Sequence, residues 1–142
     1  MVLTDIAFHY NAPDKVEYAC RLLRKAYAKG SSLYVLAEPG VVDQVEAALW
    51  TLAPASFIPH CTAGAPAYVS ARTTIQIGSA LPTEPHAPML VNLQREWVEG
   101  WQQFEKIFEI VTLDDPERQA ARDRFRRYRG RGIEPVWHEI KA

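Results

Sequence analysis

The sequence predicts a three-layer α/β fold, in which helices cover both faces of a mainly parallel sheet. Strand-like and helix-like patterns alternate along the first half of the chain, and several strand-like segments are short and almost wholly apolar. Alternation is typical of strands joined by helical crossovers, and apolar strands are typical of a sheet covered on both faces. With 142 residues, 48% of them hydrophobic, the chain fits one globular domain, residues 1–142.

The strands are predicted from alternating or continuous apolar residues. In the first strand, Ile6 and Phe8 alternate with small or polar residues, and the turn NAPD follows. The segment SLYVLA has the continuous apolar pattern of a central strand. The predicted strands cover residues 4–10, 32–37, 73–78, 88–93 and 106–113. We expect the last of these to be the final strand of the chain.

Two helices separate the early strands. The first covers about residues 14–29, with Asp14 as its cap, apolar residues at helical spacing and Gly30 at its end. The second covers about residues 40–52 and ends before Pro54. Helices in these two places complete the strand–helix–strand alternation.

Two further helices are predicted in the second half. Residues 95–104, REWVEGWQQF, have a helical pattern that Gly100 weakens. The last helix starts after Asp114 or Asp115 as cap, with Pro116 in its first turn.

The last helix concentrates positive charge. Residues 117–131 hold seven arginines against Glu117 and Asp123, a local balance of +5. Because the net charge of the chain is −1, the remaining residues sum to −6. Segregation of this kind indicates a surface for an anionic partner on an otherwise acidic body.

On a helical wheel these arginines are unevenly spread. Ala121 and Tyr128 mark the side that faces the core, with Arg124 at its margin and Phe125 on one flank. The same flank as Phe125 carries Arg118, Arg122 and Arg129. The residues directed towards solvent are Asp123, Arg126 and Arg127.

Three interpretations of this surface remain open from spacing alone. It is a solvated basic face, a patch for nucleic-acid phosphates, or a pocket for a short acidic peptide with an apolar side chain. An aromatic rim beside guanidinium groups suits the third, since guanidinium grips carboxylate through two hydrogen bonds. The acidic remainder of the chain opposes strong binding of a long polyanion.

A second surface is expected around residues 45–64. Trp50 lies near the end of a helix, and the following loop contains Phe57, Ile58, Pro59 and His60. Apolar side chains in a loop either fold back on the core as a lid or remain exposed as a binding surface for a partner protein.

Motifs of an enzyme are lacking. GxGxxG and GxxxxGK[ST] do not occur, and the turn after the first strand has no glycine and places Asp14 where a phosphate would bind. We interpret His60 and Cys61 as a turn histidine beside a small buried thiol rather than zinc ligands. Ser56 with His60 lacks the nucleophile elbow of a hydrolase. We therefore predict no catalytic residue, cofactor or metal.

The cysteines and the N-terminus suggest the cytoplasm. Cys20 and Cys61 are too few for a disulfide framework and suit a reducing compartment. The start MVLTDIAFHY lacks the basic and continuously apolar parts of a signal peptide. No run approaches the roughly 18 apolar residues that span a bilayer. We expect a cytoplasmic protein without membrane contact.

Several motifs together resemble one protein family. They are EAALW at 46–50, SFIPH at 56–60, AG at 63–64, DDPERQAAR at 114–122 and RFRRYR at 124–129. In this order and spacing the chain resembles the chi subunit of the bacterial DNA polymerase III holoenzyme, from its clamp-loader assembly. The resemblance extends along nearly the whole chain and implies a non-enzymatic adaptor, whose sheet is nucleotide-binding-like in topology without a nucleotide site.

The resemblance also implies two partners. One is the acidic, phenylalanine-ending tail of the single-stranded-DNA-binding protein, for which it implies Val111 as apolar wall, Arg118 and Arg122 as the basic pair and Phe125 as rim, with Arg129 for an upstream aspartate. Arg118 stands where the family often has lysine.

The other implied partner is the psi subunit. Trp50 and Phe57 match aromatic positions implicated in partner binding, and Pro59 and His60 adjoin them. The alternative function is a nucleic-acid-binding module that uses the basic last helix.

Overall fold

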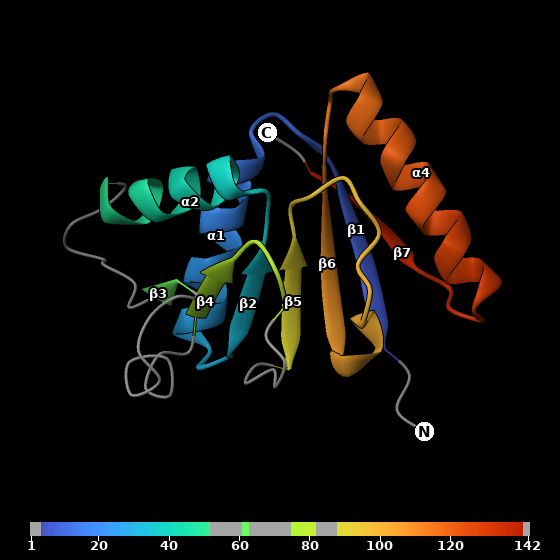
Figure 1. Cartoon of the computed structure of the whole chain (residues 1–142), viewed down its shortest axis with the longest axis horizontal. Coiled ribbons are helices and arrows are strands. Elements are labelled where there is room, and N and C mark those ends of the chain that lie inside the picture. Colours follow the sequence, from blue (N-terminus) through green and yellow to red (C-terminus); the bar gives the residue numbers. More distant parts are fainter. Residues whose placement is uncertain (1–3, 52–60, 63–74, 82–87, 141–142) are drawn as a thin grey trace.

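A single parallel sheet organises the part of the chain that the computed structural model describes, residues 4–51, 61–62, 75–81 and 88–140. Its seven strands in that part follow the order β3-β4-β2-β5-β6-β1-β7, and every pairing is parallel. Figure 1 shows α2 and β3 at one end of the sheet and α4 and β7 at the other. The elements are β1 Asp5–Ala12, α1 Lys15–Ala28, β2 Leu33–Leu36, α2 Pro39–Thr51, β3 Cys61–Thr62, β4 Ile75–Gly78, β5 Met89–Asn92, the 3₁₀ helix η2 Trp101–Gln103, β6 Lys106–Thr112, α4 Asp115–Gly130 and β7 Val136–Glu139.

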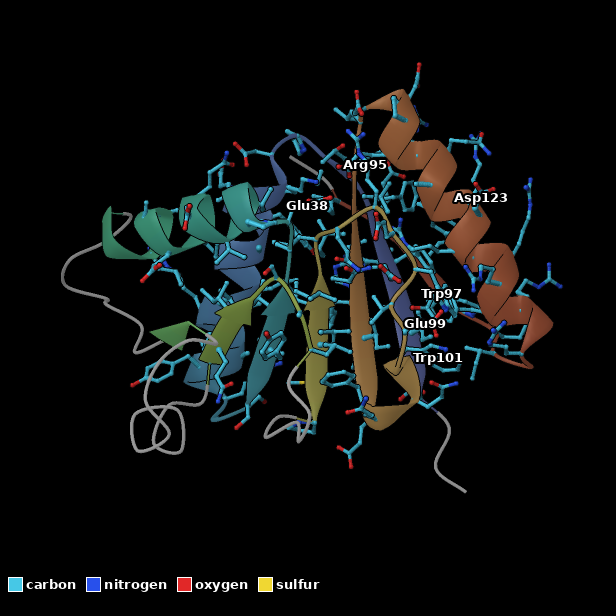
Figure 2. All side chains as sticks on the ribbon, viewed as in Figure 1. Glu38, Arg95, Trp97, Glu99, Trp101 and Asp123 are labelled. Atoms are coloured by element: carbon cyan, nitrogen blue, oxygen red, sulfur yellow. The ribbon has the colours of Figure 1, made fainter. Side chains whose placement is uncertain are left out.

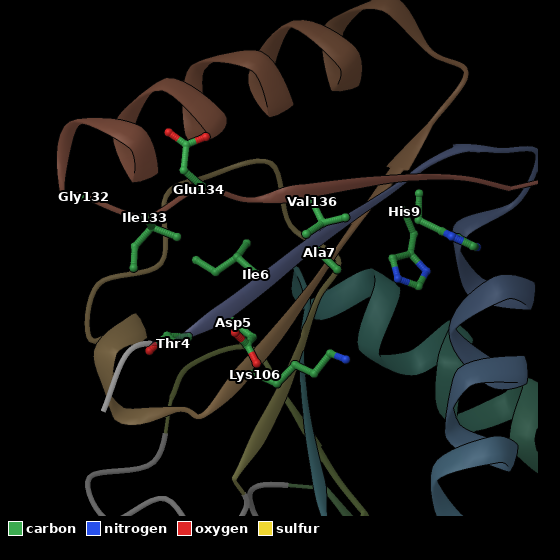
Figure 3. A pocket seen from close by; sticks show the side chains of 11 residues that line it. Thr4, Asp5, Ile6, Ala7, His9, Lys106, Gly132, Ile133, Glu134 and Val136 are labelled. Atoms are coloured by element: carbon green, nitrogen blue, oxygen red, sulfur yellow. The ribbon is translucent and has the colours of Figure 1, made fainter. Parts of the chain in front are cut away.

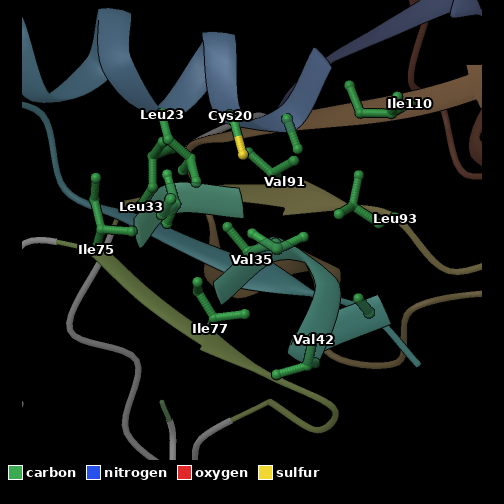
Figure 4. Packing of buried hydrophobic residues seen from close by; sticks show 14 of the residues in the cluster. Cys20, Leu23, Leu33, Val35, Val42, Ile75, Ile77, Val91, Leu93 and Ile110 are labelled. Atoms are coloured by element: carbon green, nitrogen blue, oxygen red, sulfur yellow. The ribbon is translucent and has the colours of Figure 1, made fainter. Parts of the chain in front are cut away.

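One face of the sheet is covered by α1 and α2. Strand residues on this face, among them Val35, Ile77 and Val91, pack against Leu23 of α1 and Val45 of α2 in one buried cluster (Figure 4). The apolar stripe predicted for α1 is confirmed, because its buried residues are Ala19, Cys20, Leu23 and Ala26. The burial of these side chains is the main stabilising term on this face.

The other face is covered by α4 and by the segment that joins β5 to β6. Phe8, Leu90 and Ile107 of the sheet pack there against Trp101 and Tyr128 in a second buried cluster. Figure 2 shows the side chains of Trp97 and Trp101 beside α4. The sheet therefore has helices on both faces, and the predicted three-layer α/β architecture is confirmed.

The first helix is capped as its sequence predicts. Asp14 accepts hydrogen bonds from the backbone N–H groups of Val16, at 2.9 Å, and Glu17, at 3.1 Å. Gly30 follows the helix at φ 74°, a left-handed conformation that glycine adopts without strain.

Three predictions about the second half need correction. The strand at 106–113 is not the last, since β7 follows α4 and extends the sheet beyond β1. Residues 95–104 contain only the short η2, because Gly100 takes φ 85° and interrupts the helical pattern. Asp114 occupies the cap position of α4, but its side chain makes no capping hydrogen bond.

Candidate functional site

A cavity of about 440 Å³ lies between the start of α4 and the neighbouring ends of β1, β6 and β7. Its lining residues are Tyr10, Asn11, Val111, Thr112, Arg118, Ala121, Arg122 and Trp137. We call this cavity the α4 pocket. It combines apolar, aromatic and cationic groups from segments that are far apart in the sequence.

Strand β6 and helix α4 supply the apolar floor of the α4 pocket. Side chains of β6 alternate between the two faces of the sheet, so Ile107, Glu109 and Val111 face α4 while Ile110 packs towards α1. Val111 is 2% exposed and Ala121 1% exposed. The small side chain of Ala121 leaves space beside Val111 for a ligand group.

Strand β7 supplies an aromatic wall. The ring of Trp137 lies 4.8 Å from the ring of Phe8, 5.0 Å from that of Phe125 and 5.6 Å from that of Tyr10. Phe125 does not line the α4 pocket itself, but it supports Trp137 from behind. Since aromatic rings in contact stabilise one another's placement, Trp137 is held beside the pocket although 41% of it is exposed.

A backbone irregularity shapes the rim. The pairing of β1 with β6 shifts between His9 and Ala12, and Asn11 adopts φ 66° in this interval. Asparagine tolerates the left-handed region better than most other residues. The extra residue places Tyr10 and Asn11 at the edge of the α4 pocket.

The cationic groups of the α4 pocket are Arg118 and Arg122. Both are exposed, and neither forms an ion pair with another residue that the structure describes. The two residues are four apart, so they lie on one face of α4. Two guanidinium groups without internal partners beside an apolar floor suit a ligand that carries carboxylates and an apolar side chain.

The remaining arginines of α4 are engaged elsewhere. Arg126 Nη1 lies 3.5 Å from Asp123 Oδ1, and both side chains are exposed to solvent. Arg127 lies 4.3 Å from the centre of the Trp97 ring. Arg129 Nε lies 3.4 Å from Glu134 Oε1, and its guanidinium lies over the Phe125 ring at 5.9 Å.

The structure thus brings together some of the residues expected from the sequence. Val111, Arg118 and Arg122 line the α4 pocket, Phe125 lies behind its wall, and Arg129 lies outside it. Arg129 instead lies beside Glu134, with both side chains exposed.

Other residues of the α4 pocket were not anticipated. They are Tyr10, Asn11, Thr112 and Trp137. Val136 and Trp137 are of the β-branched and aromatic types typical of strands and could have indicated β7, but nothing local to them indicates pairing with β1.

Where many α/β sheets bind phosphate, this chain makes internal contacts. The Asp14 carboxylate uses the first free N–H groups of α1. Lys15 Nζ donates a hydrogen bond of 3.1 Å to the Leu93 carbonyl oxygen at the end of β5 and pairs with Glu117 of α4. These contacts occupy the edge of the sheet next to the first turn.

Another cavity, of about 590 Å³, lies on β1 and β7 near the loop that follows α4 (Figure 3). Its charged and titratable residues are Asp5, His9, Lys106, Glu134 and His138. Burial, then His138 and the nearby lysines, lower the pKa of His9 from 6.5 to about 4. With both signs of charge and no residue expected in the site, this cavity is a weaker candidate than the α4 pocket.

Comparison with known proteins adds the decisive finding. A family model described as "DNA polymerase III chi subunit, HolC" matches residues 3–136. The chain belongs to the DNA polymerase III chi subunit family. A curated relative, the DNA polymerase III subunit chi of Pseudomonas aeruginosa, is 32% identical over 127 residues, which cover 89% of this chain and 87% of the relative.

Membership of the chi family assigns the chain an accessory role in DNA replication as a subunit of DNA polymerase III. A subunit requires at least one protein partner. The α4 pocket lies within the part of the chain that matches the chi model, except for Trp137, which directly follows it.

Most of the residues expected to bind a second partner lie outside the part of the chain that the structure describes. Phe57, Pro59 and His60 lie outside the described residues, and only the backbone of Trp50, near the end of α2, is described. The interpretation of His60 and Cys61 as a turn histidine beside a buried thiol also lies outside the description, since His60 is not described and only the backbone of Cys61 is. Within the described residues no three histidine, cysteine or acidic side chains form a group that could hold a metal. In the same part of the chi chain, no helix combines the length and apolarity needed to cross a bilayer.

Proposed function

We propose that this chi-family chain is a non-catalytic adaptor of the bacterial clamp-loader assembly, and that its α4 pocket binds the acidic C-terminal tail of single-stranded-DNA-binding protein in the cytoplasm. The observation that carries the proposal is one cavity that combines a buried apolar floor with two exposed arginines, neither of which forms an ion pair within the described part of the chain. A peptide that ends in a carboxylate and an aromatic side chain satisfies both parts.

The proposed complex assigns a role to each wall of the pocket. The terminal carboxylate of the peptide meets Arg122, and its last ring packs between Val111 and Trp137, with Phe125 behind them. Upstream aspartates meet Arg118. Arg129 can take a further aspartate by leaving Glu134, because a pair between two exposed side chains is weak.

These contacts correspond to a modest affinity. Hydrogen bonds between charged groups contribute about 1.5–3 kcal/mol each, and burial of an aromatic side chain contributes about 1.5–3 kcal/mol. Ordering of the peptide and loss of its free motion oppose binding. We expect a Kd on the order of micromolar, which corresponds to about −8 kcal/mol.

Calorimetry with short synthetic peptides tests this function. The test peptide carries several aspartates and ends in phenylalanine with a free carboxylate; one control has a C-terminal amide and another ends in alanine. We expect micromolar binding of the test peptide that weakens with added salt, and a loss of about tenfold or more for each control. Equal affinity for all three peptides, or no binding of the first, would contradict the proposal.

We also propose that a separate surface binds a psi-like subunit to form a heterodimer. Its expected residues are Trp50, Phe57, Pro59 and His60. Trp50 belongs to α2, and Figure 1 shows α2 at the opposite end of the sheet from α4, so the two proposed partners would not compete for space.

The alternative function is nucleic-acid binding through α4, and the observation that favours it is a cluster of arginines around Trp97, away from the α4 pocket. There the guanidinium groups of Arg127 and Arg131 lie 4.3 Å and 5.2 Å from the centre of the Trp97 ring. Fluorescence titration with single-stranded DNA, without the tail protein, separates the two functions. The adaptor function predicts little binding at physiological salt, whereas tight, salt-dependent binding would favour the alternative.

A further inference from the structure

A fully buried carboxylate, Glu109, lies in the middle of β6 under α4. Its Oε1 accepts a hydrogen bond of 2.6 Å from Asn92 Nδ2, and its Oε2 accepts one of 2.7 Å from the Tyr128 hydroxyl. Arg124 Nε lies 3.3 Å from Oε1, an ion-pair contact without the geometry of a hydrogen bond. Two of the three partners therefore belong to α4.

The protonation of Tyr128 supports this arrangement. Burial and the neighbouring Glu109 carboxylate raise the pKa of the Tyr128 hydroxyl, so this group remains a donor. Arg124 is 4% exposed and also donates from Nη1 to the backbone oxygen of Arg95, at 2.6 Å. The network thus joins α4 to β5, to β6 and to the segment between these strands.

Stability alone does not account for these groups. Removing charged groups from water costs several kcal/mol per ion, and apolar side chains of similar volume at such positions often give equal or greater stability. Directional contacts specify one arrangement, whereas apolar packing tolerates several. The network is better suited to select an orientation of α4 than to strengthen the fold.

Helix α4 benefits from such a selection because few apolar contacts fix its rotation. The buried apolar residues of α4 are only Ala121 and Tyr128, with Phe125 half-buried. Arginines flank this core-facing side, with Arg124 at one margin and Arg118 and Arg122 at the other. A turn by one residue position, about 100°, would exchange the arginines that face the pocket. Arg124 and Tyr128 are four residues apart on one face, so two contacts to the same carboxylate oppose that rotation.

The carboxylate and the floor of the α4 pocket are also linked by the strand. Glu109 and Val111 are two residues apart on the same face of β6. The geometry of the strand therefore fixes the distance between Val111, in the floor of the α4 pocket, and the Glu109 carboxylate that contacts Arg124 and Tyr128.

We propose that Glu109 is a positioning residue: through Arg124 and Tyr128 it sets the rotation of α4 that brings Arg118 and Arg122, rather than other arginines, to the α4 pocket. This inference rests on the proposed function for its effect on peptide affinity. Its structural part, the rotation of the helix, can be measured independently of any ligand.

The test replaces the whole network by apolar groups in the variant Glu109→Leu/Arg124→Leu/Tyr128→Phe. Three quantities are measured: the unfolding midpoint, the affinity for the aspartate- and phenylalanine-containing peptide, and the nuclear Overhauser contacts between the rings of Phe125 and Trp137. We expect a folded protein with an unfolding midpoint close to the wild-type value, an affinity lower by about tenfold or more, and weakened ring contacts.

Two further variants keep the result interpretable. Tyr128→Phe removes one contact of α4 with little change in volume, and we expect a smaller change in the same direction if the triple variant does not fold. Thr4→Val removes a buried hydrogen bond of 2.7 Å to the Phe104 oxygen, away from the network, and should leave both the affinity and the ring contacts unchanged.

The outcomes separate the two proposals. Unchanged ring contacts and affinity in the folded triple variant, or in Tyr128→Phe if the triple variant is unfolded, would overturn the positioning role. If the wild-type chain does not bind the peptide, the proposed function fails, and the ring contacts alone then decide whether Glu109 orients α4.

Discussion

The ring of Trp137 lies 5.0 Å from the ring of Phe125, at an interplanar angle of 35°. This contact joins the edge strand β7 to α4 beside Phe8 of β1, the residue in register with Trp137. Arg122 precedes Phe125 by three residues on the same helix, so the contact also places the aromatic wall next to a guanidinium group of the α4 pocket. The pocket is therefore complete only when β7 is paired with β1.

The first prediction concerns this wall. Trp137→Ala should lower the affinity for the tail peptide by about tenfold, since aromatic contacts of about 0.5–1.5 kcal/mol and part of the buried apolar area are lost. Calorimetry measures the change. Val136→Ala is the matched control, because Val136 is 64% exposed on the same strand and does not line the α4 pocket. A similar affinity for both variants would show that Trp137 is not part of the ligand site.

The second prediction compares two arginines of one helix. Arg122→Ala should lower the peptide affinity by about tenfold or more, because a charge-assisted hydrogen bond is lost, while the far-ultraviolet circular dichroism stays unchanged. Arg126→Ala should have little effect, since Arg126 pairs with Asp123 on the outer side of α4. Equal losses for the two variants would indicate a general charge effect instead of a defined contact.

The third prediction separates the two partner surfaces. Trp50→Ala and Phe57→Ala should each weaken binding of a psi-like subunit and leave the affinity for the tail peptide unchanged, because the two partners are proposed to bind separate surfaces and α2, which contains Trp50, lies at the other end of the sheet from α4. Pull-down with the psi-like subunit and calorimetry with the peptide measure the two effects. If both variants unfold, these residues form a lid on the core and the proposed psi surface is wrong.

The fourth prediction follows from His9. Burial, His138, Lys106 and Lys25 all lower its pKa, from 6.5 to about 4. The unfolded chain therefore takes up the proton at higher pH than the folded chain does. The contribution of neutral His9 to the free energy of unfolding is complete above pH 6.5 and is lost as the pH falls towards about 4.

Thermal unfolding between pH 7 and pH 4 measures this contribution. The unfolding midpoint of the wild-type chain should fall over this interval, and the fall should be smaller for His9→Gln, which cannot take up the proton. His138→Gln is informative as a second variant, because it removes a neighbour that disfavours protonation of His9 while leaving the His9 contact with the Tyr18 hydroxyl in place. Parallel curves for the wild type and His9→Gln would exclude His9 as the group responsible.

Several features were predictable because their signals are local. Asp14, the apolar stripe of α1 and Gly30 are contiguous, and the structure confirms all three. The core-facing side of the last helix was also predictable from helical spacing, since Ala121 and Tyr128 are buried. Local patterns report how a segment lies relative to water and the core.

Other features depend on contacts between distant segments. The four residues of β7 are all exposed and do not alternate between apolar and polar, so periodicity does not mark the segment as a strand. Helical spacing places Arg124 only at the margin of the core-facing side of α4. Its side chain is nevertheless buried, in contact with Glu109 of β6. Arg118 and Arg129 are equivalent in helical spacing but differ in neighbours, because Glu134 lies beside only one of them.

The sequence by itself determined the alternation of β1, α1, β2 and α2, the covering of the sheet on both faces and the concentration of arginines on the last helix, because each follows from the spacing of side chains along one segment. Only the tertiary structure decided that Arg118 and Arg122 line one cavity and that Trp137 stands beside them. The physical reason is that the strand order β6-β1-β7 arises from long-range pairing, which places residues separated by many positions around one cavity.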